Sequence, residues 1–121
     1  MKIDTILNRD ELMDRVSGDV TFLQELVELF VESYPGMIEK IDQAIQNKDS
    51  QQLENAAHEL KGVVGNFCAP EAVRAAQKMQ MNGRNADFSS TSTDFKNLAE
   101  ILNIVESALK KLVEDYTSQK N

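Results

Sequence analysis

The sequence predicts an all-α fold, an antiparallel four-helix bundle with one or two short accessory helices. Gly (5) and Pro (2) are sparse among the 121 residues, and apolar residues recur at helical spacing in several long segments. No segment shows the period-two alternation of a strand. A hydrophobic fraction of 41% suits one core, so residues 1–121 should form a single domain, with 1–8 as a lead and 117–121 as a frayed tail.

The first helices follow from capping residues and from the position of one proline. Asn8 followed by Glu11 resembles a capping box and predicts a short helix over residues 9–16. Asp19 is a suitable N-cap for a second, longer helix. Pro35 should end or kink that helix and can begin a third one, because proline disfavours helical geometry in the preceding residue.

The second half of the chain predicts three more helices. A fourth helix should begin after Asp49 and run to about Phe67, and a fifth should run from Pro70 to about Met81. Residues 83–92 are mostly polar and predict a loop before a long last helix. Short connections make neighbouring helices antiparallel.

Charge and composition exclude several classes of function. A net charge of −7 argues against nucleic acid and anionic membranes as main partners. No apolar run approaches the roughly 20 residues that span a bilayer, and the N-terminus lacks a signal-peptide core, so we expect a cytoplasmic protein. The single Cys68 allows no internal disulfide and is expected to be a small buried residue. No apolar stripe is left over, which favours a monomer.

The most informative segment surrounds His58, the only histidine. At about 100° per residue, His58 falls nearly opposite the apolar stripe of its helix, so a core histidine fits poorly and an ordinary surface histidine is the simple alternative. Lys61 and Gly62 flank it one turn on, and Gly65 lies a further turn along. Each glycine costs a helix about 1 kcal/mol relative to alanine. Either another helix packs closely there, or a partner's backbone approaches His58.

This arrangement can carry a phosphoryl group. Neutral imidazole is a nucleophile near physiological pH, and the Lys61 ammonium can offset phosphate charge. The alternative is that Lys61 is a solvated lysine that pairs with Glu54 or an adjacent carboxylate. The chain has no Gly-x-x-x-x-Gly-Lys-Ser/Thr loop and too few Cys and His residues for zinc. We therefore expect a phosphocarrier without a nucleotide, metal or cofactor site of its own, so a partner must supply the magnesium and the acidic pocket.

The segment from His58 to Ala69 resembles the signature of histidine-containing phosphotransfer (HPt) domains, roughly A-H-x-L-K-G followed by an apolar residue and G-A. Cys68 departs from it, since the family often has glycine there. Gly18-Asp19, Leu29-Phe30 and Tyr34-Pro35 extend the resemblance, which covers most of residues 9–84.

The resemblance implies a function and a set of site residues. His58 is then the phosphoacceptor, which receives the group from a receiver-domain aspartyl phosphate and passes it to another receiver, with a histidine kinase upstream in a separate or the same parent chain. Lys61 supports the charge, Gly62 and Gly65 give docking clearance, and Gln80 bonds the imidazole or the phosphate. The implied docking surface comprises Leu12, Met13, Val16 and Glu54, of which the apolar three could instead belong to the core.

Two rival functions fit the same residues. The chain could be the phosphoacceptor domain of a chemotaxis-type histidine kinase, fed directly by an ATP-binding domain. It could also be an adaptor bundle that binds its partners without phosphate, although the presence of both His58 and Lys61 argues against that role.

Overall fold

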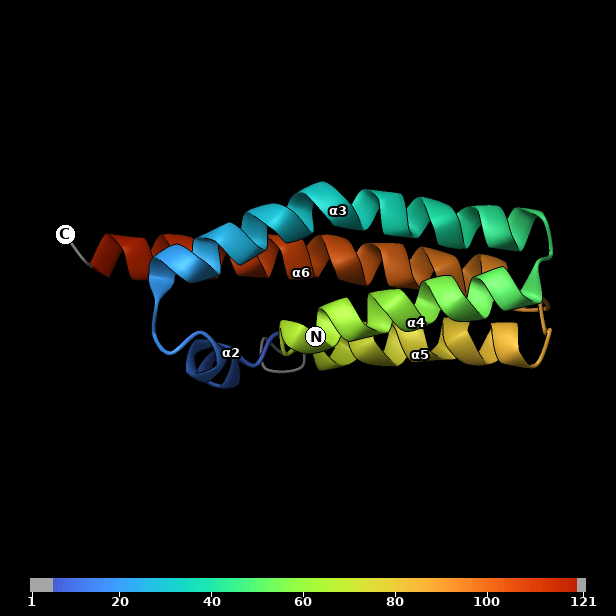
Figure 1. Ribbon diagram of the computed structural model, residues 1–121, viewed down its shortest axis with the longest axis horizontal. Coiled ribbons are helices and arrows are strands. Elements are labelled where there is room, and N and C mark those ends of the chain that lie inside the picture. Colours follow the sequence, from blue (N-terminus) through green and yellow to red (C-terminus); the bar gives the residue numbers. More distant parts are fainter. Residues whose placement is uncertain (1–5, 120–121) are drawn as a thin grey trace.

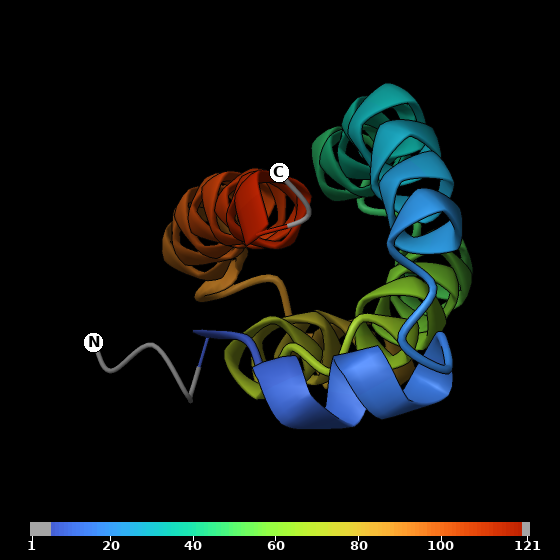
Figure 2. The same ribbon diagram turned by 90° about the vertical axis from the view of Figure 1, so that its left-hand side faces the viewer.

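A computed structural model describes residues 6–119 of the chain. Within this range it contains no strand and five helices: α2 (Arg9–Arg15), α3 (Val20–Gln46), α4 (Ser50–Asn66), α5 (Pro70–Arg84) and α6 (Thr91–Gln119). Figure 1 shows α3 to α6 as an antiparallel bundle in which α3 and α6 extend well beyond α4 and α5. The short α2 lies across the end of α4 and α5, beside the overhanging ends of α3 and α6, as the end-on view in Figure 2 shows. The predicted all-α bundle is therefore confirmed.

Three of the predicted caps begin helices in the structure. The side chains of Asn8, Asp19 and Asp49 each accept a hydrogen bond of 3.0–3.1 Å from the backbone amide three residues later. Each cap satisfies one of the donors that the first turn of a helix leaves without an intrahelical partner. Pro70 begins α5, where a missing amide hydrogen costs nothing.

The core lies in the middle of a ring of helices, in which each long helix packs against two others: α3 against α4, α4 against α5, α5 against α6, and α6 against α3. Two residues of the predicted lead, Ile6 and Leu7, join this core, so the lead is packed from residue 6 onward. The largest completely buried side chains are Leu7, Leu12, Leu23, Ile41, Leu53, Leu60, Met79, Leu98, Leu102, Leu109, Leu112 and Val64.

Of the two outcomes predicted at Pro35, an end or a kink of the helix, the end is wrong and no third helix begins there, because α3 continues through it. A proline inside a helix costs about 3 kcal/mol. Phe30, Tyr34 and Ile41 lie on either side of it and are buried, and each such side chain contributes roughly 1.5–3 kcal/mol on burial. Their packing outweighs the cost of the proline, whose own side chain is exposed. Figure 1 shows that α3 bends near its middle.

Two other boundaries also differ from the prediction. Helix α5 extends to Arg84, so the connecting loop is shorter than the predicted 83–92 and occupies residues 85–90. Helix α6 continues through the predicted frayed tail as far as Gln119, and the Thr117 hydroxyl donates to the Val113 carbonyl at 2.6 Å. The rest of the predicted tail and residues 1–5 of the lead lie outside the described residues.

Candidate functional site

The candidate site is built on the hairpin of α4 and α5. His58 is exposed on α4, as its position opposite the apolar stripe predicts. Its Nδ1 lies 3.2 Å from Nε2 of Gln80 on α5, so the structure brings together the two side chains that the resemblance pairs. Gln80 itself is only 7% exposed. The imidazole is therefore held from beneath by a nearly buried amide, while the rest of the ring faces outward.

The contact leaves one polar atom of each side chain without a partner. Oε1 of Gln80 is buried and accepts no hydrogen bond. Nε2 of His58 has no hydrogen-bond partner among residues 6–119. Because a glutamine amide carries a donor and an acceptor of nearly the same shape, half a turn of the amide would bring Oε1 to the position that Nε2 of Gln80 now occupies. The amide can thus donate to Nδ1 or accept from it.

Lys61 lies one turn beyond His58 and is half-buried. Across residues 6–119 it forms no ion pair. The alternative in which Lys61 pairs with Glu54 or an adjacent carboxylate is therefore not what the structure shows, and Oε2 of Glu54 instead binds Nε of Arg84 at 2.8 Å. The Lys61 ammonium is left without a carboxylate partner on the same helix face as His58.

The two predicted clearance glycines differ in their surroundings. A Cβ added to Gly62 would meet no atom within 4 Å, so helix packing does not explain this glycine. A Cβ added to Gly65 would lie 3.9 Å from Cγ2 of Val73, which is an ordinary contact. Open space beside His58 is thus a property of position 62, whereas position 65 lies against α5.

The predicted docking surface needs correction. Leu12 is completely buried and Val16 is 3% exposed, so both belong to the core and offer no surface to a partner. Met13 is half-buried and packs against the core. Glu54 is engaged by Arg84. The short helix α2 turns its apolar face inward and covers the end of the bundle. Its apolar residues therefore belong to the core, which was the alternative to a docking surface.

Sequence reasoning missed Gly83, which the boundary error assigned to a loop. Gly83 is buried near the end of α5. A Cβ there would lie 2.8 Å from the Ser50 carbonyl oxygen and 2.9 Å from Cα of Glu54, and closer still to the Glu54 amide nitrogen. The backbones of α4 and α5 therefore touch one turn before His58. In the sequence, one signal alone indicates that α5 extends to Arg84: the helical spacing continues through Met79 and the residues after it.

Cys68 occupies the turn between α4 and α5 in a left-handed backbone conformation, with φ of 56°. Residues other than glycine rarely adopt this conformation. Because this turn requires a left-handed backbone, glycine is the residue expected at position 68 in related sequences. The thiol is free and buried, and burial raises its pKa. Cys68 thus behaves as the small buried residue that was predicted.

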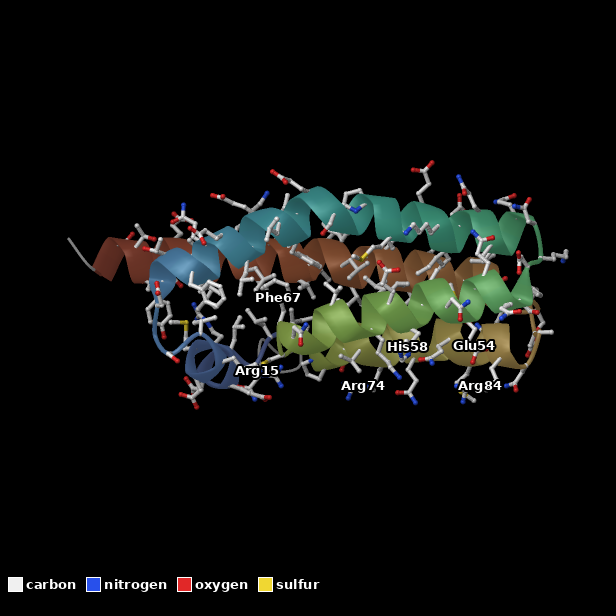
Figure 3. The ribbon with its side chains drawn as sticks, viewed as in Figure 1. Arg15, Glu54, His58, Phe67, Arg74 and Arg84 are labelled. Carbon is white, nitrogen blue, oxygen red and sulfur yellow. The ribbon has the colours of Figure 1, made fainter. Side chains whose placement is uncertain are left out.

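Charge is unevenly distributed along the chain. Residues 50–84, which include α4 and α5, contain four basic and three acidic residues, whereas the whole chain has a net charge of −7. Figure 3 shows Arg74 and Arg84 on the same side of the molecule as His58. The candidate site therefore lies in a segment of the chain that carries no net negative charge.

Two other kinds of site are absent from the described range. No three His, Cys, Asp or Glu side chains among residues 6–119 are grouped so that they could hold a metal ion. None of the helices within these residues has both the length and the apolar character that crossing a membrane requires.

Comparisons with known proteins agree on one family. The family model for the Hpt domain matches residues 25–116. The chain is similar to the HPT domain of a sensor hybrid histidine kinase from Shewanella, with a TM-score of 0.74 at 22% identity, over 94% of this chain and 97% of that one. It is also similar to histidine-containing phosphotransfer protein B of Pseudomonas aeruginosa, with a TM-score of 0.71 at 21% identity, over 80% of this chain and 91% of that one. No curated protein sequence matches it significantly.

Proposed function

The chain belongs to the Hpt domain family of histidine phosphotransfer modules in phosphorelay signalling, and we propose that His58 is the residue that carries the phosphoryl group. The observation that supports this proposal is the setting of the single histidine. It stands exposed on α4, its Nδ1 is held by Gln80, and its Nε2 is open. A histidine held in this way is oriented for attack by one nitrogen only.

The chemistry assigns a role to each ring nitrogen. A ring nitrogen attacks phosphorus through its lone pair, so the proton of the neutral imidazole must be on the other nitrogen. When the Gln80 amide offers Oε1, this oxygen accepts a hydrogen bond from Nδ1–H, which keeps the proton on Nδ1 and the lone pair on Nε2. The new bond joins Nε2 to phosphorus, the bond from phosphorus to the donor's aspartate oxygen breaks, and the aspartate leaves as a carboxylate. Return of the group to a second aspartate reverses these steps.

Lys61 and Gly62 complete the proposed site. The Lys61 ammonium has no carboxylate partner in the described part of the chain and can offset the charge of the transferred group. The open space at Gly62 lets a partner's backbone come close to His58. We assign Gly65 no separate clearance role, because it faces Val73.

Receiver domains are the proposed partners on both sides of the transfer. One receiver aspartyl phosphate donates to His58, and a second receiver aspartate accepts from it, with a histidine kinase acting upstream of the first. The magnesium ion belongs to the receiver in this scheme. A monomeric state and a cytoplasmic location stay predictions from the sequence.

The test is transfer from a receiver domain charged with radiolabelled acetyl phosphate. The wild-type chain is expected to take up label that is acid-labile and alkali-stable, as a phosphohistidine is. His58→Gln, which keeps a polar side chain on this exposed surface, should take up none. Equal labelling of the two proteins, or no label on a wild-type chain that still binds the receiver, would contradict the proposal.

The same assay separates the two rival functions. An adaptor bundle would bind the receiver without acquiring label. A chemotaxis-type phosphoacceptor would take label from ATP through a kinase ATP-binding domain and only poorly from a charged receiver. Faster uptake from the receiver than from ATP and such a kinase domain supports the relay function.

A further inference from the structure

The presence of glycine at position 83, near the end of α5, is not explained by a reversal of the chain. A glycine near the end of a helix usually reverses the chain with a positive φ. After α5 the positive φ belongs to Ala86, at 50°, and the only glycine with a positive φ in residues 6–119 is Gly18. Gly83 lies inside α5, where glycine is less favourable than alanine. Its role must therefore come from its neighbours.

Those neighbours are backbone atoms of α4. The carbonyl oxygen of Ser50 and Cα of Glu54 lie within 3 Å of the position of a Cβ on Gly83. Backbone atoms inside a helix cannot rotate away as the end of a long side chain can. Carbon atoms pack at about 3.5 Å or more, and a Cβ here would lie 2.9 Å from Cα of Glu54, so any larger residue would push the two helices apart by roughly 0.6 Å or more.

Two contacts between the helices lie within one turn of Gly83. Gln80, three residues earlier, reaches Nδ1 of His58 at 3.2 Å, and Arg84, the next residue, reaches Oε2 of Glu54 at 2.8 Å. The first contact is close to the limit of a useful hydrogen bond, so a small separation of the helices would break it. Because α5 is a continuous helix over Pro70–Arg84, a displacement at Gly83 moves Gln80 as well.

We infer that Gly83 is a positioning residue of the phosphotransfer site, which holds α5 close enough to α4 for Gln80 to orient the His58 imidazole. This inference rests on the proposed function of His58. It explains why the least helix-favouring residue apart from proline is found where α5 meets α4. It also assigns part of the site's geometry to a residue that touches neither the imidazole nor the phosphoryl group.

The first test is Gly83→Ala, with Gly36→Ala as the matched control. Gly36 lies inside α3, and a Cβ there would meet no atom within 4 Å. The readout is the ¹⁵N chemical shift of Nδ1 of His58 in the unphosphorylated protein, which reports its hydrogen bond directly. Gly83→Ala should give the shift of Gln80→Ala, and Gly36→Ala that of the wild type. A wild-type Nδ1 shift in folded Gly83→Ala would overturn the inference.

A double-mutant cycle then links the contact to transfer. Removing one hydrogen bond should slow uptake from a charged receiver about three- to tenfold, so Gln80→Ala and Gly83→Ala should each show such a loss. If Gly83 acts through Gln80, the double variant is no more than about twofold slower than Gly83→Ala. Multiplying losses would show that Gly83 acts independently and would refute the inference.

A second variant covers the case in which Gly83→Ala fails to fold. Gln80→Asn shortens the side chain by one methylene, and its amide should lose the imidazole if helix separation limits the reach. A wild-type Nδ1 shift in Gln80→Asn would overturn the inference without any change at Gly83. The shift measurements need no phosphate. A wild-type chain that binds the receiver but takes up no label would therefore refute the function of His58, while the Nδ1 shifts would still decide the role of Gly83.

Discussion

Replacing Gly62 by alanine should make the protein more stable and a poorer phosphoacceptor. The added Cβ would meet no atom within 4 Å, so it creates no clash in the folded chain. Alanine is favoured over glycine inside a helix by about 1 kcal/mol, partly because it restricts the unfolded chain. For a domain of this size, that gain raises the midpoint of thermal unfolding by about 4 °C.

The same methyl group should obstruct the partner. Interfaces pack as densely as protein interiors, and an extra methyl group in a packed contact costs about 1–3 kcal/mol. A receiver that approaches His58 across position 62 should therefore transfer roughly 5- to 150-fold more slowly at limiting concentration. Calorimetry and label uptake measure the two effects on the same preparation.

Gly36→Ala is the control, because Gly36 is equally open and lies on α3. It should gain similar stability and keep the wild-type rate. A loss of stability in Gly62→Ala would show that α4 is crowded at this position. An unchanged transfer rate would show that no partner uses this clearance.

Two further predictions concern single residues outside the reacting face. Cys68→Gly should change the free energy of unfolding by no more than about 1 kcal/mol, because relief of the strain of the left-handed backbone offsets the lost burial of the side chain. Cys68→Val should lower it by at least about 2 kcal/mol, because a β-branched residue is strained at φ of 56°. Urea unfolding at neutral pH measures both changes, and equal effects would show that backbone strain does not decide the stability here. Burial raises the pKa of the Asp94 carboxyl, but hydrogen bonds from Ser90 and Asn82 and the nearby Lys78 ammonium outweigh burial and hold this pKa below 3.8, its ordinary value. The stability that ionised Asp94 contributes is thus fully present above about pH 4 and is lost as the pH falls below it. Between pH 5 and pH 2.5, the free energy of unfolding, measured in urea, should therefore fall less for Asp94→Asn than for the wild type. An unchanged pH dependence would contradict this prediction.

Features set by local sequence were predicted well. The caps at Asn8, Asp19 and Asp49 involve atoms three residues apart, so the sequence around them is sufficient to predict them. The exposure of His58 followed from helical periodicity alone. Its contact with Gln80, 22 positions away, followed from the family resemblance rather than from any local pattern.

Features decided by packing between helices were predicted poorly. Pro35 carries a strong local signal to end a helix, yet the buried side chains around it keep α3 continuous. Leu12 and Val16 could have faced either a partner or the core, and only the position of α2 across the end of the bundle decides. Gly83 resembles a loop residue until the backbone of α4 is found beside it. In each case the competing contact comes from a distant part of the chain.

The uneven charge of the molecule has a consequence for how it meets other proteins in solution. Outside residues 50–84 the chain has a net charge of −8, while the hairpin that bears His58 has a net charge of +1. An approaching acidic surface is repelled by most of the molecule and least by this hairpin, so encounters are steered toward His58 before any atoms touch. Two copies of the chain repel each other over most orientations. Added salt should weaken both effects, because screening acts over about 10 Å at 0.1 M ionic strength.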